Sequence, residues 1–312
     1  MNNIYDISLK LPLDFALYYS HKKFNNYDIE LKPLLNGKKS DCLKEEDIYW
    51  FHTIKAPDNS PWLKVGKSDS TYILRFNTIE FIFIKSSKEV FYKAFKDCSQ
   101  NEIEHIFFNQ VLPLVLNSMG IEVLHASSIL TSKGAVAFVG DSGFGKSTIA
   151  TSLISQGCKL LSDDAVPLVL KDNQVFTSNG PRKMNLWPRA GKLLNIDLKN
   201  NELKKSYITL NENQHALGNH PLKHIYFLKP STERNEIAFM PISGQEAIIS
   251  LVKAAQRLDI NDKAMLTRQI QTLSKVANLV ETKNLHYPIN NSDPTKISSA
   301  ILSQIETHSY AA

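Results

Sequence analysis

The early part of the chain alternates apolar and polar positions with the period of a β-strand. The stretches TYILRFN and IEFIFIK both show this alternation, and we predict two antiparallel strands joined by a short turn. EIEHIFFNQVLPLVLNSMG instead repeats its apolar residues at helical spacing, so we predict a helix that Pro113 kinks and Gly120 ends. The pattern changes near residue 120, which predicts a β-rich N-terminal module over 1–119 and a second domain over 120–312.

Strand-like and helix-like segments alternate beyond residue 120, as is typical of an α/β domain. The predicted strands are IEVLHASSIL, GAVAFVG, KLLSDDAVPLVL, QVFTSN, HIYFLK and IAFMP. The predicted helices are GQEAIISLVKAAQRL, DKAMLTRQIQTLSKVANLVETK and TKISSAILSQIE. TSKG and KDN, each between two predicted strands, predict hairpin turns.

Composition narrows the class of protein. The chain has 312 residues and a formal net charge of +5, but its Lys and Arg residues form no basic block, so we expect no nucleic-acid partner. No apolar run approaches the ~20 residues of a membrane helix, and we expect no membrane partner. Cys42, Cys98 and Cys158 share no metal-ligand spacing, and the N-terminus lacks a secretion-type pattern. These features favour a reducing, cytoplasmic location.

The segment GDSGFGKS matches the phosphate-loop pattern G-x-x-x-x-G-K-[S/T] and lies between an apolar strand and an amphipathic helix. Its glycines allow backbone N–H groups to face a phosphate, while Lys146 supplies charge and Ser147 a hydroxyl for Mg²⁺. A glycine-rich connection with a chance lysine is the alternative. We predict that Gly157 ends the helix. The residues predicted to bind the nucleotide are Gly140, Asp141, Ser142, Gly143, Phe144, Gly145, Lys146, Ser147, Thr148 and Arg182.

Two neighbouring acids follow soon after this helix. Asp163 and Asp164 interrupt an apolar segment, and neighbouring side chains of an extended chain leave it on opposite faces. One carboxylate could therefore address a metal while the other accepts a proton from an incoming hydroxyl. A surface turn is the alternative. His125, in VLHASSIL, is either a core histidine or a group that reaches the phosphates.

The order LHAS, GDSGFGKST, SQGCKLLSDD resembles the catalytic domain of bacterial HPr kinase/phosphorylase and its smaller relatives, over 124–164 most specifically. Those relatives include kinases found with lasso-peptide gene clusters and kinases of free serine. The resemblance implies a P-loop kinase domain of the HPr-kinase/PEP-carboxykinase-like type, with ATP and Mg²⁺ as cofactors. It implies that Ser147 binds the metal and that Asp163 and Asp164 divide metal binding and general-base duty, with Asp163 favoured as the metal ligand and Asp164 as the base. Lys146 and His125 complete the implied catalytic group.

One segment departs from the HPr kinase/phosphorylase pattern. The glutamate and glycine-rich E-x-R-G-x-G segment is missing, which puts a reverse phosphorylase activity in doubt. NGPRKMNLWPRA stands there instead and resembles the corresponding segment of the lasso-cluster kinases. Leu186 and Trp187 are either core or functional, whereas Arg182, Lys183 and Arg189 are candidate cations for a triphosphate or an acceptor carboxylate.

Later polar and apolar groups have simpler interpretations. Lys204, Lys205 and Tyr207 either help to close the nucleotide pocket or lie on a solvated edge strand. A polar loop is expected to carry three histidines that lack zinc-ligand spacing, namely His215, His220 and His224. We expect the apolar residues of the later helices to pack in the core or between subunits, so a homo-oligomer is a candidate assembly. They are Ile248, Leu251, Val252, Met265 and Leu273.

Together these patterns predict an ATP-dependent kinase that transfers the γ-phosphate to a serine hydroxyl. The first acceptor is a serine of a peptide or protein, in particular of a lasso-type precursor peptide. HPr or free serine is the alternative acceptor. A non-catalytic ATP-binding regulatory module and a carboxykinase-like enzyme acting on a small carboxylic acid remain open.

Overall fold

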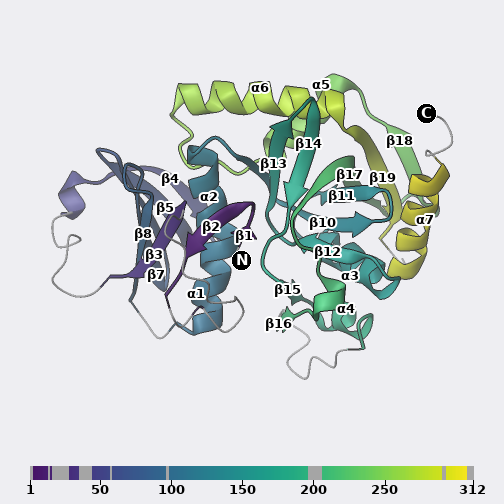
Figure 1. Ribbon diagram of the computed structural model, residues 1–312, viewed down its shortest axis with the longest axis horizontal. Helices are drawn as coiled ribbons and strands as arrows, with labels where there is room; N and C mark the ends of the chain where they lie inside the picture. Colours follow the sequence, from purple (N-terminus) through teal and green to yellow (C-terminus); the bar gives the residue numbers. More distant parts are fainter. Residues whose placement is uncertain are drawn as a thin grey trace. The chain divides into compact units, whose positions relative to one another are not determined.

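The computed structural model divides into two compact units (Figure 1). Residues 1–120 and 257–266 form the first unit, and 121–256 and 267–312 form the second. A segment of the predicted second domain, 257–266, thus belongs to the first unit. The structure describes residues 3–12, 15, 28–34, 44–56, 58–95, 98–195, 206–289 and 293–307.

An eight-stranded sheet dominates the first unit, in the order β1-β2-β3-β8-β7-β6-β5-β4. The predicted hairpin is present as β6 and β7, and the run from β4 to β8 is antiparallel throughout. The strands are β1 Asn3–Ile4, β2 Ile7–Lys10, β3 Ile29–Pro33, β4 Tyr49–Lys55, β5 Pro61–Ser68, β6 Thr71–Phe76, β7 Ile79–Ile84 and β8 Glu89–Ala94; a 3-10 turn spans Glu45–Asp47.

The predicted kinked helix is present in the same unit. It consists of α1 (Gln100–Ile106), a π-helical turn (Phe107–Val111) and α2 (Leu112–Ser118). Pro113 has no N–H to donate, and the wider turn directly before it accommodates that loss. The ring of Phe107 lies 6.2 Å from that of Phe81 on β7, so the helix packs against the sheet.

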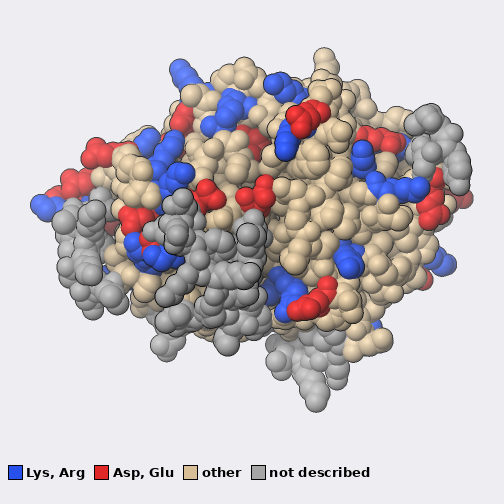
Figure 2. Space-filling view, viewed as in Figure 1, with Lys and Arg blue, Asp and Glu red and all other residues tan. Residues whose placement is uncertain are grey.

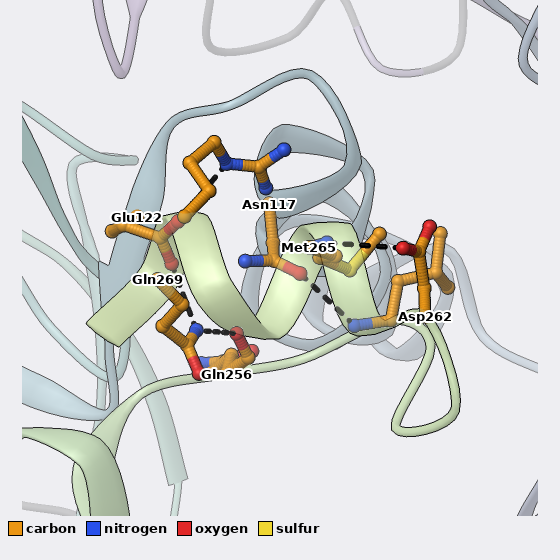
Figure 3. Close-up of polar contacts among 8 residues, drawn as sticks. Asn117, Glu122, Gln256, Asp262, Met265 and Gln269 are labelled. Atoms are coloured by element: carbon orange, nitrogen blue, oxygen red, sulfur yellow. Dashed lines mark hydrogen bonds and ion pairs between the residues drawn. The ribbon is translucent and has the colours of Figure 1, made fainter. Parts of the chain in front are cut away.

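Segment 257–266 is held by polar contacts within the first unit. Asn117 Oδ1 accepts a hydrogen bond from the backbone N–H of Leu258 at 3.2 Å (Figure 3). The Tyr72 hydroxyl donates to Asp259 Oδ2 at 3.3 Å, and the Asp259 side chain is buried. Each contact joins residues more than 100 positions apart. The sequence pattern therefore gives no sign of this segment's place.

The second unit contains a nine-stranded sheet whose main path is β12-β10-β11-β17-β14-β13-β9, with β19 and β18 extending it beside β17. β11, β17 and β19 are parallel neighbours, while the predicted hairpins β10–β11 and β13–β14 are antiparallel. The strands are β9 Glu122–Leu124, β10 Ala126–Thr131, β11 Gly134–Val139, β12 Lys159–Ser162, β13 Val166–Lys171, β14 Gln174–Ser178, β15 Lys183–Leu186, β16 Ser206–Thr209, β17 Asn219–Ser231, β18 Ala238–Pro241 and β19 Glu281–Pro288. The helices are α3 Lys146–Ser155, α4 Pro188–Lys192, α5 Gly244–Ala254, α6 Lys263–Leu279 and α7 Pro294–Thr307, with a 3-10 turn at Glu212–Gln214; the first residues of α6, 263–266, belong to the first unit.

Helices cover both faces of this sheet, because its central strands are apolar on both sides. Val136 and Phe138 of β11 share one buried cluster with residues of α3 and α7. Ala135 and Ala137, which point the other way, share a second cluster with residues of α5 and α6. Figure 1 shows α3 and α7 on one side of the strands and α5 and α6 on the other. The unit is therefore a mixed α/β structure.

Two sequence-based predictions for this unit are wrong. The helix predicted over DKAMLTRQIQTLSKVANLVETK ends at Leu279, and the next residues form strand β19, which pairs with β17 over eight register positions. The three histidines do not share a polar loop. His220 and His224 lie on β17, and His215 forms a β-bridge with Leu160. Long-range strand pairing overrides the local pattern in both cases.

A buried carboxylate organises the start of β9 (Figure 3). Glu122 is fully buried and accepts a hydrogen bond from Gln269 Nε2 at 2.8 Å, and Arg268 Nε lies 3.5 Å from its other oxygen. Gln269 also donates to the carbonyl of Gln256, whose own N–H donates to the carbonyl of Val123. These bonds fix the chain just before His125.

The exposed charges are mixed in sign. On the face drawn in Figure 2, Lys and Arg atoms lie between Asp and Glu atoms without a large area of one sign. Cys98 and Cys158 carry free thiols, and Cys42 lies outside the described residues. Among the described helices, none has the length and hydropathy needed to cross a membrane.

Candidate active site

The segment 140–148 connects β11 to α3 and adopts the backbone that its glycines permit. Gly143 has φ +88° and Gly145 φ +84°, values that residues with a Cβ rarely adopt. A Cβ on Gly140 would lie 3.1 Å from the Cβ of Leu228, so the backbone of the loop passes close to that side chain. Gly145 is the N-cap of α3, and the N–H groups of the following turn are oriented to bind an anion.

Lys146 is held across this loop. Its side chain is 7% exposed, and Nζ donates to the carbonyls of Gly140 at 2.8 Å and Asp141 at 3.3 Å. An ammonium group fixed in this way adds positive charge to the N-terminal end of α3. The same contacts hold the two ends of the loop together.

Tyr287 holds the loop from another strand of the same sheet. It lies on β19, is 5% exposed, and its hydroxyl donates to the carbonyl of Phe144. Burial raises the pKa of Tyr287, so the hydroxyl remains a donor throughout the neutral range. No prediction from the sequence included this residue, because β19 itself was not predicted.

Asp163 and Ser147 together offer the oxygen ligands that Mg²⁺ prefers. Asp163 is 4% exposed, and its Oδ1 accepts hydrogen bonds from Ser147 Oγ at 3.1 Å and from Ser127 Oγ. Mg²⁺ in nucleotide sites is commonly held by one or two protein oxygens, phosphate oxygens and water. The donor set therefore fits this ion. Within the described ranges, no group of three or more His, Cys, Asp or Glu forms a separate metal site.

Asp164 and His125 lie side by side at two breaks in the sheet. β9 ends and β10 begins around His125, while β12 gives way to β13 after Asp164, and these strands pair with one another. His125 Nδ1 is 3.1 Å from the carbonyl oxygen of Asp164, which can only accept, so Nδ1 carries the proton. Asp164 has φ +67°, so the chain is not extended there as the sequence argument assumed.

Two hollows meet at the loop. The first is lined by His125, Ser142, Gly143, Gly145, Lys146, Ser147, Thr148, Asp164, Asn185, Leu186, Trp187 and Ala190. The second is lined by His125, Val139, Gly140, Asp141, Ser142, Phe144, Phe227, Leu228, Lys229, Ser250, Lys253 and Ala254. His125 and Ser142 line both. The first contains Ser147, Asp164 and His125, and the second contains two lysines from different elements, Lys229 and Lys253.

The structure thus brings together the predicted loop residues, Asp163, Asp164 and His125. It does not bring Arg182 to them: Arg182 lines neither hollow, and its Nη1 lies 3.5 Å from Glu212 Oε1. Lys183 also lines neither hollow.

The remaining residues that the sequence suggested for the site differ in their exposure, and some of them lie outside the described residues. Leu186 is buried in the core, whereas Trp187 is 45% exposed at the first hollow. Tyr207 lies on β16 and is exposed, which agrees with the edge-strand alternative. Lys204 and Lys205, and the side chain of Arg189, lie outside the described residues.

Sequence reasoning missed several residues of the site. Ser127, Tyr287, Lys229 and Lys253 belong to it by contact or lining. Ser127 had a usable signal, since it follows His125 by two residues in a segment predicted as one strand, where alternate side chains share a side. Lys229 and Lys253 had none, because exposed lysines occur throughout the chain.

Comparisons with known proteins add a distant similarity. No protein-family model matches this sequence, and no curated protein matches it. Among solved structures, the chain is similar to the HPr(Ser) kinase/phosphatase from Coxiella burnetii, with 14% identity and a TM-score of 0.33. The similarity covers 61% of this chain and 97% of that chain. The geometry of the site therefore carries the functional proposal.

Proposed function

We propose that this protein is an ATP-dependent phosphotransferase that phosphorylates a serine hydroxyl. The observation that supports it is one hollow lined by the glycine-rich loop, by Ser147 and by Asp164, with the buried Asp163 accepting a hydrogen bond from Ser147. A loop alone would account for nucleotide binding. The second, separate carboxylate beside it adds a group that could accept the proton of an incoming hydroxyl.

Each group has a defined task in this reaction. The loop N–H groups and Lys146 bind the phosphates and offset the charge that grows as the γ-phosphoryl group is transferred. Ser147 and Asp163 would hold Mg²⁺, which supplies positive charge at the phosphate oxygens. Asp164 accepts the hydroxyl proton while the serine oxygen forms its bond to γ-phosphorus. The bond from that phosphorus to the bridging oxygen breaks, and ADP leaves.

His125 positions the base. Its Nδ1–H donates to the backbone carbonyl of Asp164, and its backbone N–H donates to the carbonyl of Ala254 at 2.8 Å. The imidazole therefore holds the left-handed turn at Asp164 in place. His125 also lines both hollows.

A serine of a peptide or protein is the acceptor class that we propose first. The stretch PR-x-x-x-LWP resembles that of the lasso-cluster kinases. Lys229 and Lys253 would give the second hollow affinity for an anionic group on the acceptor. HPr and free serine are the alternative acceptors.

The test is intact-mass analysis after incubation of the protein and Mg-ATP with a C-terminal-serine precursor peptide, HPr and free serine. We expect one added phosphoryl group on one acceptor. Asp164→Asn should lower the rate about 10²- to 10⁴-fold while ATP binding persists. Asp172→Asn, in the exposed turn between β13 and β14, is the matched control and should change neither. ATP binding without transfer to any acceptor would instead indicate a nucleotide-binding module.

A further inference from the structure

Trp187 is an exposed aromatic residue in the wall of the first hollow. Its side chain is 45% exposed, although the adjoining Leu186 is 1% exposed and lies in the core. Leu186 and Ala190 line the hollow beside it, so the indole belongs to an apolar wall that faces the polar loop. A large exposed indole in such a wall is typical of a ligand contact.

The backbone around Trp187 is rigid. Its carbonyl accepts hydrogen bonds from the N–H groups of Ala190 at 2.9 Å and Gly191 at 3.2 Å. Pro188, the first residue of α4, fixes the next φ angle. On the other side, β15 pairs with β16 through Leu186 and Ser206. The backbone of Trp187 is thus held between a strand and a helix, which fixes the point from which the indole extends toward the hollow.

The direction in which a triphosphate runs along the loop indicates which part of a nucleotide reaches this wall. In a phosphate loop, the lysine binds the outer phosphates and the backbone N–H groups bind the inner ones. Thr148 lies beyond Lys146 in the first turn of α3 and lines the same hollow as Trp187 and Ala190. Asp164 and His125, the groups for transfer, line this hollow too, and His125 extends to the second. This leaves the nucleoside for the Trp187 wall.

We propose that Trp187 stacks against the base of the bound nucleotide and so positions it. Asn185 adds a polar contact, since it lines the same wall and its buried Oδ1 has no hydrogen-bond partner among the described residues. An amide is able to accept from a base amino group and donate to a ring nitrogen. The inference rests on the proposed function only for the presence of a nucleoside triphosphate.

The test compares binding of Mg-ATP and Mg-tripolyphosphate by calorimetry, because tripolyphosphate has the phosphates without the nucleoside. Trp187→Ala should weaken ATP binding about 5- to 100-fold and leave tripolyphosphate binding unchanged. Trp187→Phe should restore most of the ATP affinity, since a phenyl ring also stacks. Leu217→Ala is the control, because Leu217 is 74% exposed in the same unit and lines neither hollow.

Other results of this test would contradict either the stacking proposal or the proposed function. Equal weakening of both ligands in Trp187→Ala would mean that the residue only supports the loop, and unchanged ATP binding would mean that the base lies elsewhere. Either result overturns the stacking proposal but leaves phosphoryl transfer intact. If the parent protein bound neither ligand, the proposed function would fail and the inference with it. A raised acceptor KM with unchanged ATP binding would assign Trp187 to the acceptor instead.

Discussion

Replacing Tyr287 with phenylalanine should loosen the phosphate loop, whereas the same change at Tyr226 should not. Both hydroxyls are buried in one core, and burial raises the pKa of both tyrosines. The Tyr287 hydroxyl donates to the Phe144 carbonyl. Among the described residues, the Tyr226 hydroxyl has no hydrogen-bond partner. The pair therefore separates the loss of a buried hydrogen bond from the loss of a buried hydroxyl.

The expected change in the free energy of unfolding differs between the two variants in sign as well as in size. Tyr287→Phe leaves a loop carbonyl without its donor, which costs about 1–3 kcal/mol. For a unit of this size that lowers Tm by about 2–4 °C per kcal/mol. Tyr226→Phe removes a polar atom that was desolvated without compensation, so its unfolding free energy should stay the same or rise.

The assay is thermal unfolding of both variants, together with Mg-tripolyphosphate binding. We expect weaker binding only for Tyr287→Phe, since only that residue holds the loop. Because the pKa of each phenol is raised in the fold, the unfolded chain loses these protons first, and stability should fall as pH rises above about 10. Equal Tm changes in the two variants, or a loop that binds tripolyphosphate unchanged without Tyr287, would refute the reasoning.

Three further predictions concern the second unit. Burial lowers the pKa of His215 to about 4, so the unfolded chain takes up a proton first as the pH falls. The free energy of unfolding should therefore drop by about 3 kcal/mol between pH 6.5 and 4. Denaturant unfolding should show this pH dependence in the parent protein and not in His215→Gln. Gly140→Ala would place a Cβ 3.1 Å from Leu228 Cβ and should weaken ATP binding in calorimetry, while an unchanged Kd would contradict this close approach. Ser127→Ala removes a hydrogen bond to Asp163 and should raise the Mg²⁺ concentration needed for half-maximal ATP binding several-fold, whereas a purely structural role would lower Tm alone.

The local chemistry of the loop and its turns was readable from the sequence. GDSGFGKS requires glycine backbones wherever it occurs, and Gly157 has φ +94° at the end of α3 as predicted. Asp172 and Asn173 adopt the left-handed conformation that a tight hairpin needs. These features depend on a few neighbouring residues, so a single sequence is enough to predict them.

Contacts between segments far apart in the chain could not be predicted from the sequence. Tyr287 reaches Phe144 across 143 positions, and its strand continues directly from a helical run whose pattern hides the boundary. Arg182 looked suited to phosphate because of its charge, but its place is set by β15, which turns it toward Glu212. His224 is buried because β17 is central in the sheet, a fact of topology.

The assignment of 257–266 to the first unit has a consequence for dissecting the protein. The chain passes between the units three times, at 120/121, 256/257 and 266/267, so neither unit is a contiguous piece of the gene product. A fragment beginning at Ile121 would contain Leu258 and Asp259, both buried in the whole chain, without Asn117 and Tyr72. The unit that carries the glycine-rich loop is therefore not a portable module, and transplanting it into another protein would require either a rewritten segment or both units together.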